Sequence, residues 1–301
     1  MKYCPECGYE PFYEPAIFCA MCATKLKDKD DALSKDDTMS AEEFKMAMKP
    51  FEFERLPDGG INLTSIRNKL STVASIPYGV TSIGNGVFKK CPNLTNIYLP
   101  YSLTSIGDQA FGWCKGKCSA DIYIEDLESF CAIDFASGSA NPLAYSKSLI
   151  AGGKPVTEIS LDGGLRAIKD NTFYGFESLK KAEIGEGILS LGEFAFAYCY
   201  GLTSVTLPES LTTLGVGVFY NCKSLVSAEI KGGVSLLEKW TFSGCKSLRT
   251  LTLPQSLTEI GKEALKGCDS LEQIVFHGTK KQWKSLKFDT PLPKKLKIRF
   301  V

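Results

Sequence analysis

One short pattern recurs every 23 residues along this chain, and this repetition limits the folds that the chain can adopt. The stretch EGILSLGEFAFAYCYGLTSVTLP begins at Glu186, and the next, ESLTTLGVGVFYNCKSLVSAEIK, begins at Glu209. Aligning the two places Phe196 on Phe219. A repeat of this length cannot bury its apolar face alone, so neighbouring repeats must stack and cover one another. The pattern therefore predicts a solenoid.

Each repeat is built from the same parts. Two inward apolar positions, such as Ile97 and Leu99, predict a short strand, which a proline without an N–H often ends. A second apolar pair is usually followed by a glycine, which permits the turn across to the other side. A short helical turn should then deliver a phenylalanine, with a cysteine three residues later. We therefore predict a leucine-rich repeat solenoid, mainly of short parallel β-strands, with short helical turns on the other side.

Stacking of the repeats is expected to align equivalent side chains. Neighbouring strands lie roughly 4.8 Å apart, so like residues should form a phenylalanine spine beside a cysteine spine. Free cysteine is among the most buried residue types, so we interpret the cysteine spine as inert reduced thiols rather than as a metal or redox site. The spine positions are Phe88, Phe111, Phe173, Phe196, Phe219, Phe242, Cys91, Cys114, Cys199, Cys222, Cys245 and Cys268.

The solenoid, residues 51–301, is expected to be closed by caps at both ends. Residues 51–77 alternate around Pro57–Gly60, a turn able to accept positive φ, and predict a hairpin that forms the N-terminal cap. Residues 277–301 predict the C-terminal cap, with a final strand at Lys297–Phe300.

One repeat is longer than the others, and we interpret residues 125–155 as an insert within it. A short helix is expected over Leu127–Ile133, followed by an irregular loop. The C-terminal cap has a similar sequence pattern. Its segment GTKKQWKSLKF carries the aromatic residues Trp283 and Phe288 at positions where the insert also has aromatic residues. Those two matching residues are Phe130 and Phe135.

Two CxxC pairs mark residues 1–26 as a separate domain. Cys4 and Cys7 form the first pair, and Cys19 and Cys22 form the second. Four thiolates suit tetrahedral Zn²⁺ and leave no open position for a substrate, so one structural zinc ion is expected. A segment this short cannot hold a core unaided, so the metal must supply its folding free energy. The stretch resembles the small zinc-ribbon family found at bacterial N-termini, although Ala23 replaces the usual glycine.

Residues 27–50 are expected to form a linker with a short helix. A mixed-charge run comes first, and a capping box at Ser40–Glu43 then predicts a helix that ends before Pro50. Two interpretations of this helix stay open. It is either a marginal helix that frays, or a lid laid over the open first coil of the solenoid.

The repeats themselves resemble a known family. SLTSIGDQAFGWC, LTSVTLP and the closing GTKKQWKSL are similar to the BspA-like leucine-rich repeats, across about Phe51 to Val301. The resemblance implies a surface protein of bacteria or protists that binds host or matrix proteins. The sequence also shows no secretory signal and no apolar run of 18 residues, so a cytoplasmic protein without a membrane span is expected.

The concave face of the sheet is the expected binding surface of such a solenoid. Its tyrosines either simply suit β-strands or serve as a paired anchor for a protein partner. The candidate residues are Tyr98, Tyr123, Ser160, Glu183, Thr206, Glu229 and Thr252. Because His277 is the only histidine and has no expected partner base, we predict no enzyme but a protein–protein interaction module.

Two alternative functions remain open at this stage. Residues 278–301 carry eight Lys or Arg residues against one Asp, which favours an anionic partner such as nucleic acid. The family resemblance favours instead a BspA-type surface adhesin that is exported without a recognisable signal.

Overall fold

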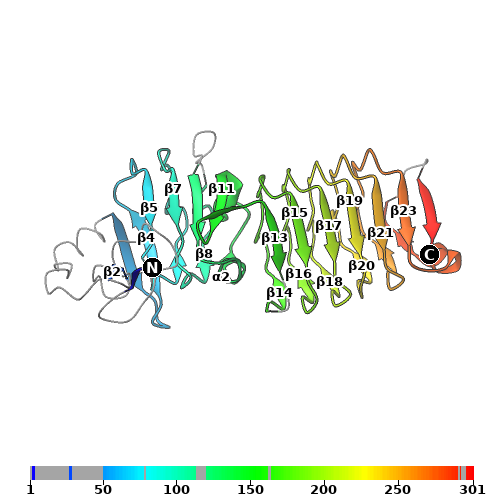
Figure 1. Cartoon of the computed structure of the whole chain (residues 1–301), viewed down its shortest axis with the longest axis horizontal. Helices are drawn as coiled ribbons and strands as arrows, with labels where there is room; N and C mark the ends of the chain where they lie inside the picture. The colour runs from blue at the N-terminus through cyan, green and yellow to red at the C-terminus, as the bar shows by residue number, and fades with distance from the viewer. Residues whose placement is uncertain are drawn as a thin grey trace. The chain divides into compact units, whose positions relative to one another are not determined.

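The computed structural model describes residues 2–3, 27–28, 50–77, 79–112, 120–161, 164–290, 292 and 296–301. It divides into two compact units, Met1–Pro155 and Val156–Val301 (Figure 1). The predicted linker helix and almost all of the predicted zinc domain lie outside the described residues. Strands β1 (Lys2–Tyr3) and β2 (Lys27–Asp28) are described, and they pair antiparallel.

The first unit begins with the predicted hairpin. Strands β3 (Phe51–Arg55) and β4 (Ile61–Ile66) pair antiparallel, and Gly59 between them has a φ of +87°. This conformation suits a residue without a Cβ. The hairpin prediction is therefore confirmed.

Short parallel strands then alternate between two sheets in the first unit. One sheet has the order β10-β8-β6-β4-β3, and the other has the order β12-β11-β9-β7-β5. The strands are β5 (Val73–Ser75), β6 (Ser82–Ile83), β7 (Asn96–Tyr98), β8 (Ser105–Ile106), β9 (Ala120–Ile124), β10 (Asp134–Phe135), β11 (Ser146–Ala151) and β12 (Lys154–Val156).

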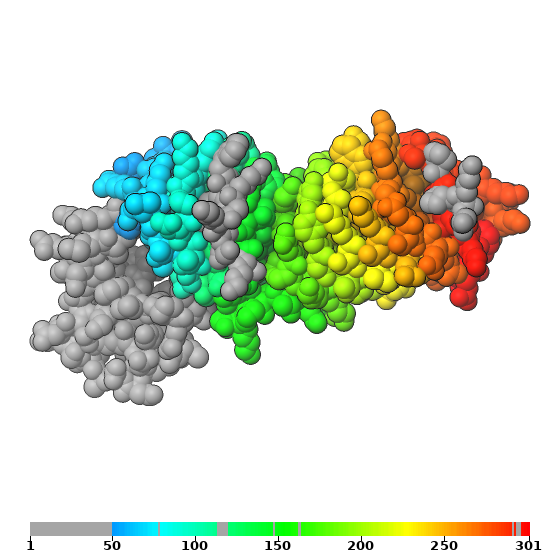
Figure 2. Space-filling view, turned by 90° about the horizontal axis from the view of Figure 1, so that it is seen from above, coloured from blue at the N-terminus to red at the C-terminus, as the bar shows by residue number. Residues whose placement is uncertain are grey.

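The second unit continues the same architecture around a longer sheet. Seven parallel strands have the order β13-β15-β17-β19-β21-β23-β25, and two three-stranded sheets lie on the other side of the coils. Successive coils form adjoining bands of colour in Figure 2. The strands are β13 (Glu158–Leu161), β14 (Ala167–Ile168), β15 (Lys181–Ile184), β16 (Ser190–Leu191), β17 (Ser204–Leu207), β18 (Thr213–Leu214), β19 (Ser227–Ile230), β20 (Leu236–Leu237), β21 (Thr250–Leu253), β22 (Glu259–Ile260), β23 (Gln273–Phe276), β24 (Lys287–Phe288) and β25 (Lys297–Phe300).

The prediction of helical turns between these strands was wrong. The segment around each spine phenylalanine is a series of turns, and residues four apart in it, such as Phe194 and Tyr198, have φ values of 52° and 61°. A right-handed helix cannot contain such residues. In their place, alternate N–H groups donate to the next coil, as Phe196 N does to the Val218 oxygen at 2.9 Å. The turns therefore add a third set of hydrogen bonds between coils, beside the two sets made by the strands on either side.

The repeated glycine serves close approach rather than an unusual φ. Gly215 is outside the left-handed region, but a Cβ there would lie 2.6 Å from the Glu193 nitrogen of the preceding coil. A Cβ at Gly261 would lie 2.8 Å from the Leu237 oxygen. Glycine therefore lets these coils approach closely, although Lys169 and Glu238 occupy the equivalent position in two other coils.

Both spines are present in the described coils. Phe219 is fully buried, and its ring centroid lies 5.6 Å from that of Phe196 and 5.3 Å from that of Phe242. Cys222 and Cys245 are also fully buried. The prediction that equivalent residues align from coil to coil is confirmed for these positions.

The segment predicted as an insert has the local structure of the C-terminal cap. Helix α2 (Leu127–Cys131) leads into β10, and helix α3 (Lys280–Ser285) leads into β24. Phe130 and Phe135 have ring centroids 5.5 Å apart, and those of Trp283 and Phe288 are 5.7 Å apart. In the first unit this segment continues through a 3-10 turn at Pro142–Tyr145 to β11. The boundary between the two units follows directly after it.

Candidate functional site

The outward-facing residues of the seven-stranded sheet lie in one straight row. Strand alternation buries Val205 and Leu207 of β17 and turns Thr206 outward. The parallel register aligns Thr206 with its neighbours. We call the row the outer row of the second unit, and it consists of Ser160, Glu183, Thr206, Glu229, Thr252, Val275 and Arg299. The structure thus brings together five of the predicted binding residues.

The other two predicted residues form a pair in the first unit. Tyr98 on β7 and Tyr123 on β9 are register partners, and their rings stack with centroids 4.3 Å apart at 18°. The side-chain amide of Asn96 donates to the Tyr123 hydroxyl at 3.0 Å, which fixes the second ring. Burial, followed by the neighbouring Tyr123, raises the pKa of Tyr98. Each tyrosine is half-buried, so the pair presents a rigid amphipathic surface.

Charge is unevenly satisfied along the outer row of the second unit. Glu183 forms an ion pair with Lys181 of the same strand. Glu229 instead stands between Thr206 and Thr252, and its carboxylate makes no hydrogen bond or ion pair with any described residue. The middle of the row therefore presents the Glu229 carboxylate with one threonine hydroxyl on each side.

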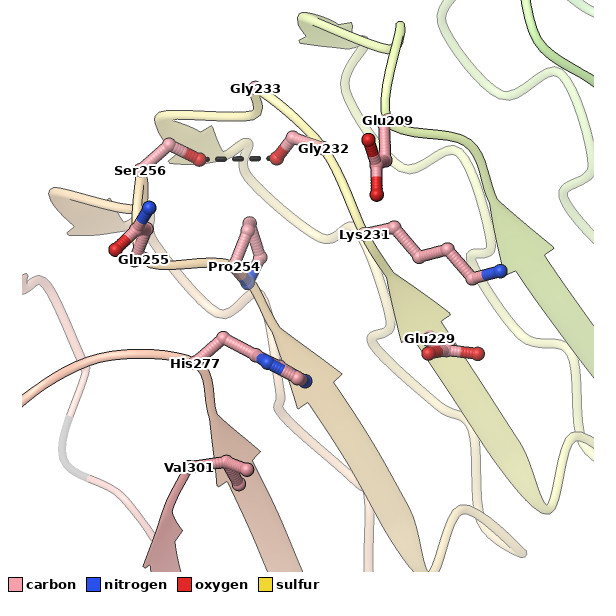
Figure 3. Close-up of a pocket in the computed structure, with 10 residues that line it drawn as sticks. All are labelled: Glu209, Glu229, Lys231, Gly232, Gly233, Pro254, Gln255, Ser256, His277 and Val301. Atoms are coloured by element: carbon pink, nitrogen blue, oxygen red, sulfur yellow. Dashed lines mark hydrogen bonds between the residues drawn. The ribbon is translucent and has the colours of Figure 1, made fainter.

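A pocket opens beside the outer row, where strands β17 to β25 end (Figure 3). Its volume is about 700 Å³. In Figure 3 the Lys231 side chain extends toward β17, and the His277 ring projects from the end of β23 across β21. The lining residues are Glu209, Glu229, Lys231, Gly232, Gly233, Pro254, Gln255, Ser256, His277 and Val301.

Two glycines make room for this pocket. The coils before and after carry Glu209–Ser210 and Gln255–Ser256 at the positions of Gly232–Gly233. A Cβ on Gly232 would overlap the backbone oxygen of Glu209, whereas a Cβ on Gly233 would meet nothing closer than 3.5 Å. The pocket is thus open because Gly232 and Gly233 have no side chains, and the absence of a side chain on Gly232 also lets its coil lie against the preceding one.

These neighbouring glycines provide a matched test of the close approach. We expect Gly232→Ala to lower the free energy of unfolding by about 1–3 kcal/mol, because the coils must separate to admit the methyl group. Gly233→Ala should change it by less than about 0.5 kcal/mol. Denaturant unfolding of both variants measures the difference, and equal effects would contradict the packing described.

The hydroxyl group of the pocket is bonded to backbone oxygens and not to the histidine beside it. The Ser256 hydroxyl, which shares the pocket with His277, donates to the backbone oxygens of Gly232 and Val234 at 3.1 and 2.8 Å. Within the described ranges, no three His, Cys, Asp or Glu residues are placed to hold a metal ion.

The cysteine spine is held by hydrogen bonds that the sequence analysis did not predict. The thiol of Cys222 donates to the Phe196 oxygen at 3.1 Å, and that of Cys245 donates to the Phe219 oxygen at 3.1 Å. Burial raises the pKa of both thiols. They therefore stay protonated and unreactive near neutral pH.

An aromatic group on the turn side of the second unit was not predicted. The rings of Tyr198 and Tyr220 lie 5.4 Å apart, and those of Tyr220 and Trp240 lie 6.2 Å apart. Trp240 Nε1 also donates to Glu263 at 3.0 Å. The group, Tyr174, Phe194, Tyr198, Tyr220 and Trp240, lies within two residues of the spine phenylalanines, which was its signal in the sequence. Its rings pack against one another and cover the turns.

The predicted zinc ligands, Cys4, Cys7, Cys19 and Cys22, lie outside the described residues. The basic C-terminal cap is described in part, with Lys280, Lys281 and Lys284 on α3. In the part of the chain that the structure describes, every helix is too short or too polar to cross a membrane.

The repeats match a known family. A profile of the BspA type leucine rich repeat region matches six copies, which cover residues 62–137 and 156–291. These ranges make up more than half of the chain. The unmatched stretch between them ends where the second unit begins. No protein of curated function matches the chain.

Several solved structures are similar to this chain. The leucine rich repeat protein TpLRR of T. pallidum is 24% identical, with 74% of this chain and 88% of that chain covered and a TM-score of 0.40. The Pneumococcal vaccine antigen PcpA is 19% identical, with 76% and 74% covered and a TM-score of 0.37. A leucine rich cell surface protein of Faecalibacterium prausnitzii is 17% identical, with 81% and 97% covered and a TM-score of 0.29.

Proposed function

The chain belongs to the family of BspA-type leucine-rich repeats, and from this premise we propose that it is a non-enzymatic module that binds a protein partner through the outer face of its sheets. The observation that carries this proposal is the stacked pair of Tyr98 and Tyr123. The two rings are held in place on a rigid pair of strands and are half exposed to solvent. Binding therefore costs little side-chain entropy, and tyrosine is enriched among residues that dominate interfaces.

The surface around the pair supports the same function. Val73 of β5 and Tyr101, which follows β7, expose 47% and 37% of their surface and add apolar area to this unit. Asp121 lies beside Tyr123 and accepts a hydrogen bond from Ser148. An apolar centre with a polar edge is the usual composition of a protein–protein interface.

We expect the double substitution Tyr98→Ala with Tyr123→Ala to abolish capture of the specific partner. The test compares proteins captured from lysate or from culture medium by the full chain and by the double variant, with quantitative mass spectrometry. Loss of one of these two aromatic anchors typically weakens binding by about 2 kcal/mol or more. A partner held equally well by the variant would contradict the proposal.

Two controls accompany this comparison. Tyr174→Ala with Tyr198→Ala removes another pair of half-buried tyrosines, with centroids 5.1 Å apart, from the turn side. Capture should survive this change. Added competitor RNA or DNA should also leave capture unchanged, whereas a steep loss with nucleic acid or salt would favour the basic C-terminal cap as the binding surface.

We further propose that residues 1–26 bind one structural zinc ion through Cys4, Cys7, Cys19 and Cys22. Two CxxC pairs support this proposal, because they provide a full tetrahedral set of thiolates. The expected result is one zinc per chain by elemental analysis, lost in a variant with Cys4→Ser and Cys19→Ser. Cys131→Ser, which changes a buried thiol of the first unit, should keep the metal.

Removal of the zinc should unfold only the N-terminal segment. Because the segment has little core of its own, the metal supplies its folding free energy, whereas the solenoid is stabilised by its stacked coils. A strong chelator should therefore leave the main thermal transition of the chain unchanged. Loss of that transition on chelation would contradict the proposed division.

A further inference from the structure

The pocket beside the outer row is lined by two carboxylates that have no hydrogen-bond or ion-pair partner among the described residues. These carboxylates belong to Glu209 and Glu229. Every other ionisable side chain of the lining is either Lys231 or His277. With histidine neutral, the side chains of the lining carry a net negative charge.

The freedom of Glu209 follows from the glycine pair. One coil earlier, the equivalent residue Glu186 accepts hydrogen bonds from the backbone N–H groups of Glu209 and Ser210, each at 3.0 Å. These two bonds hold the pKa of Glu186 below its usual value. Glu209 cannot repeat this arrangement, because the Gly232 backbone lies directly against the Glu209 backbone. Its carboxylate is therefore released toward the pocket (Figure 3).

The Lys231 side chain lies between the two glutamates in Figure 3, but it forms no ion pair with either carboxylate. Its charge contributes to the lowered pKa of Glu186, which lies outside the pocket lining, and its side chain extends toward β17 (Figure 3). His277 borders the opposite side. Pro254 also lines the pocket, and its ring gives the lining an apolar contact for an aliphatic side chain.

We propose that this pocket receives an arginine or lysine side chain presented by the protein partner. The aliphatic stem would lie on Pro254, while the charged head would reach Glu209 and Glu229. Charge-assisted hydrogen bonds of this kind are the strong ones, and the planar guanidinium of arginine is best suited to two carboxylates. This inference rests on the proposed protein-binding function and names the side chain that the second unit selects.

The single histidine makes the pocket directly observable. Because His277 is the only histidine of the chain, its ring Cε1–H gives one assignable resonance in the NMR spectrum. The probe is N-acetyl-argininamide, titrated into the full chain, and the neutral isostere N-acetyl-citrullinamide is the matched control. We expect the arginine probe to shift the His277 resonance saturably and the citrulline probe to leave it unchanged.

Two variants connect the signal to the carboxylates. Glu209→Gln with Glu229→Gln should weaken binding of the arginine probe by about tenfold or more, because both charged acceptors are removed. Glu272→Gln changes a carboxylate outside the pocket lining that already has Arg249 as its ion-pair partner, and it should leave the titration unchanged. A backbone amide spectrum of each variant shows that the fold is kept.

Each other outcome overturns the inference. Equal shifts with arginine and citrulline would show that charge is not recognised. A shift with N-acetylglutamate alone would show an anion site, and no shift with any probe would show that the pocket is unused. None of these results affects the test of the tyrosine pair, so the proposed function can hold even if this inference fails. Failure of the proposed function would appear separately, in the partner-capture experiment.

Discussion

Phe219→Ala is expected to lower the free energy of unfolding by about 3–5 kcal/mol. The ring is fully buried and stacks on Phe196 and Phe242 in the neighbouring coils. Truncation removes the contacts to both coils at once and leaves a cavity that the rigid turns cannot close. The turns are fixed because the Phe219 backbone N–H donates to the Thr241 oxygen at 2.9 Å.

The energetic effect of this substitution should appear in both stability and cooperativity. Solenoid stability is approximately a sum of repeat terms and interface terms, so weakening one coil weakens two interfaces. Denaturant unfolding of the full chain should show a lower midpoint, and amide exchange should rise first in residues 194–244. Phe300→Ala is the control, because its ring is 37% exposed and lies nearly perpendicular to that of Phe276, with centroids 6.5 Å apart. A loss as large in the control would contradict the central role of the phenylalanine spine.

The alignment of side chains across coils could be predicted because two periods act together. The repeat of 23 residues sets equivalent positions, and strand alternation decides which of them point inward. Thr206 and Glu229 therefore had to share one row, whatever the details of the turns. The pairing of Tyr98 with Tyr123 follows in the same way, although the two residues are more than one repeat length apart.

The turns could not be predicted because local propensity opposes them. Bulky residues such as Phe194, Tyr198 and Trp240 adopt left-handed conformations that cost roughly 1–2 kcal/mol each. That cost is offset by bonds to the next coil, for example from Tyr198 N to the Tyr220 oxygen at 2.7 Å. Such bonds exist only after stacking, so no single repeat shows them.

Two other features of the fold are also marked in the sequence. The match between the segment at Phe130 and the cap at Trp283 was recognised, but a cap motif inside a chain also indicates that a compact unit ends there. The pocket had a signal in Gly232 and Gly233, which interrupt the polar pattern of the neighbouring coils. Its shape depends on how closely two coils approach, and this distance is not encoded in one repeat.

A steep loss of stability is expected at alkaline pH because of the buried thiols. Burial is the main cause that raises the pKa of Cys199, Cys222, Cys245 and Cys268, and it raises the pKa of Cys131 to about 12. In the unfolded chain a thiol titrates near about 8.5. Above that pH the unfolded state releases protons that the folded state keeps, so the unfolded state is favoured. The stabilisation is complete below about pH 8.5 and is lost as pH rises toward the folded pKa.

Comparison of two variants isolates the contribution of one thiol from that of other titrating groups. Cys222→Ala removes the thiol and its hydrogen bond to Phe196, and we expect it to be destabilising at pH 7. Above about pH 8.5 the wild type loses roughly a factor of ten in its folding equilibrium per pH unit for this thiol, and the variant does not. The difference should therefore shrink and then reverse. Leu225→Ala truncates a buried, non-titratable side chain of the same coil, so the free energy that it costs should stay constant with pH. A constant difference for Cys222→Ala as well would show that the thiol titrates alike in both states, and the interior of the coils would then have to admit a charge.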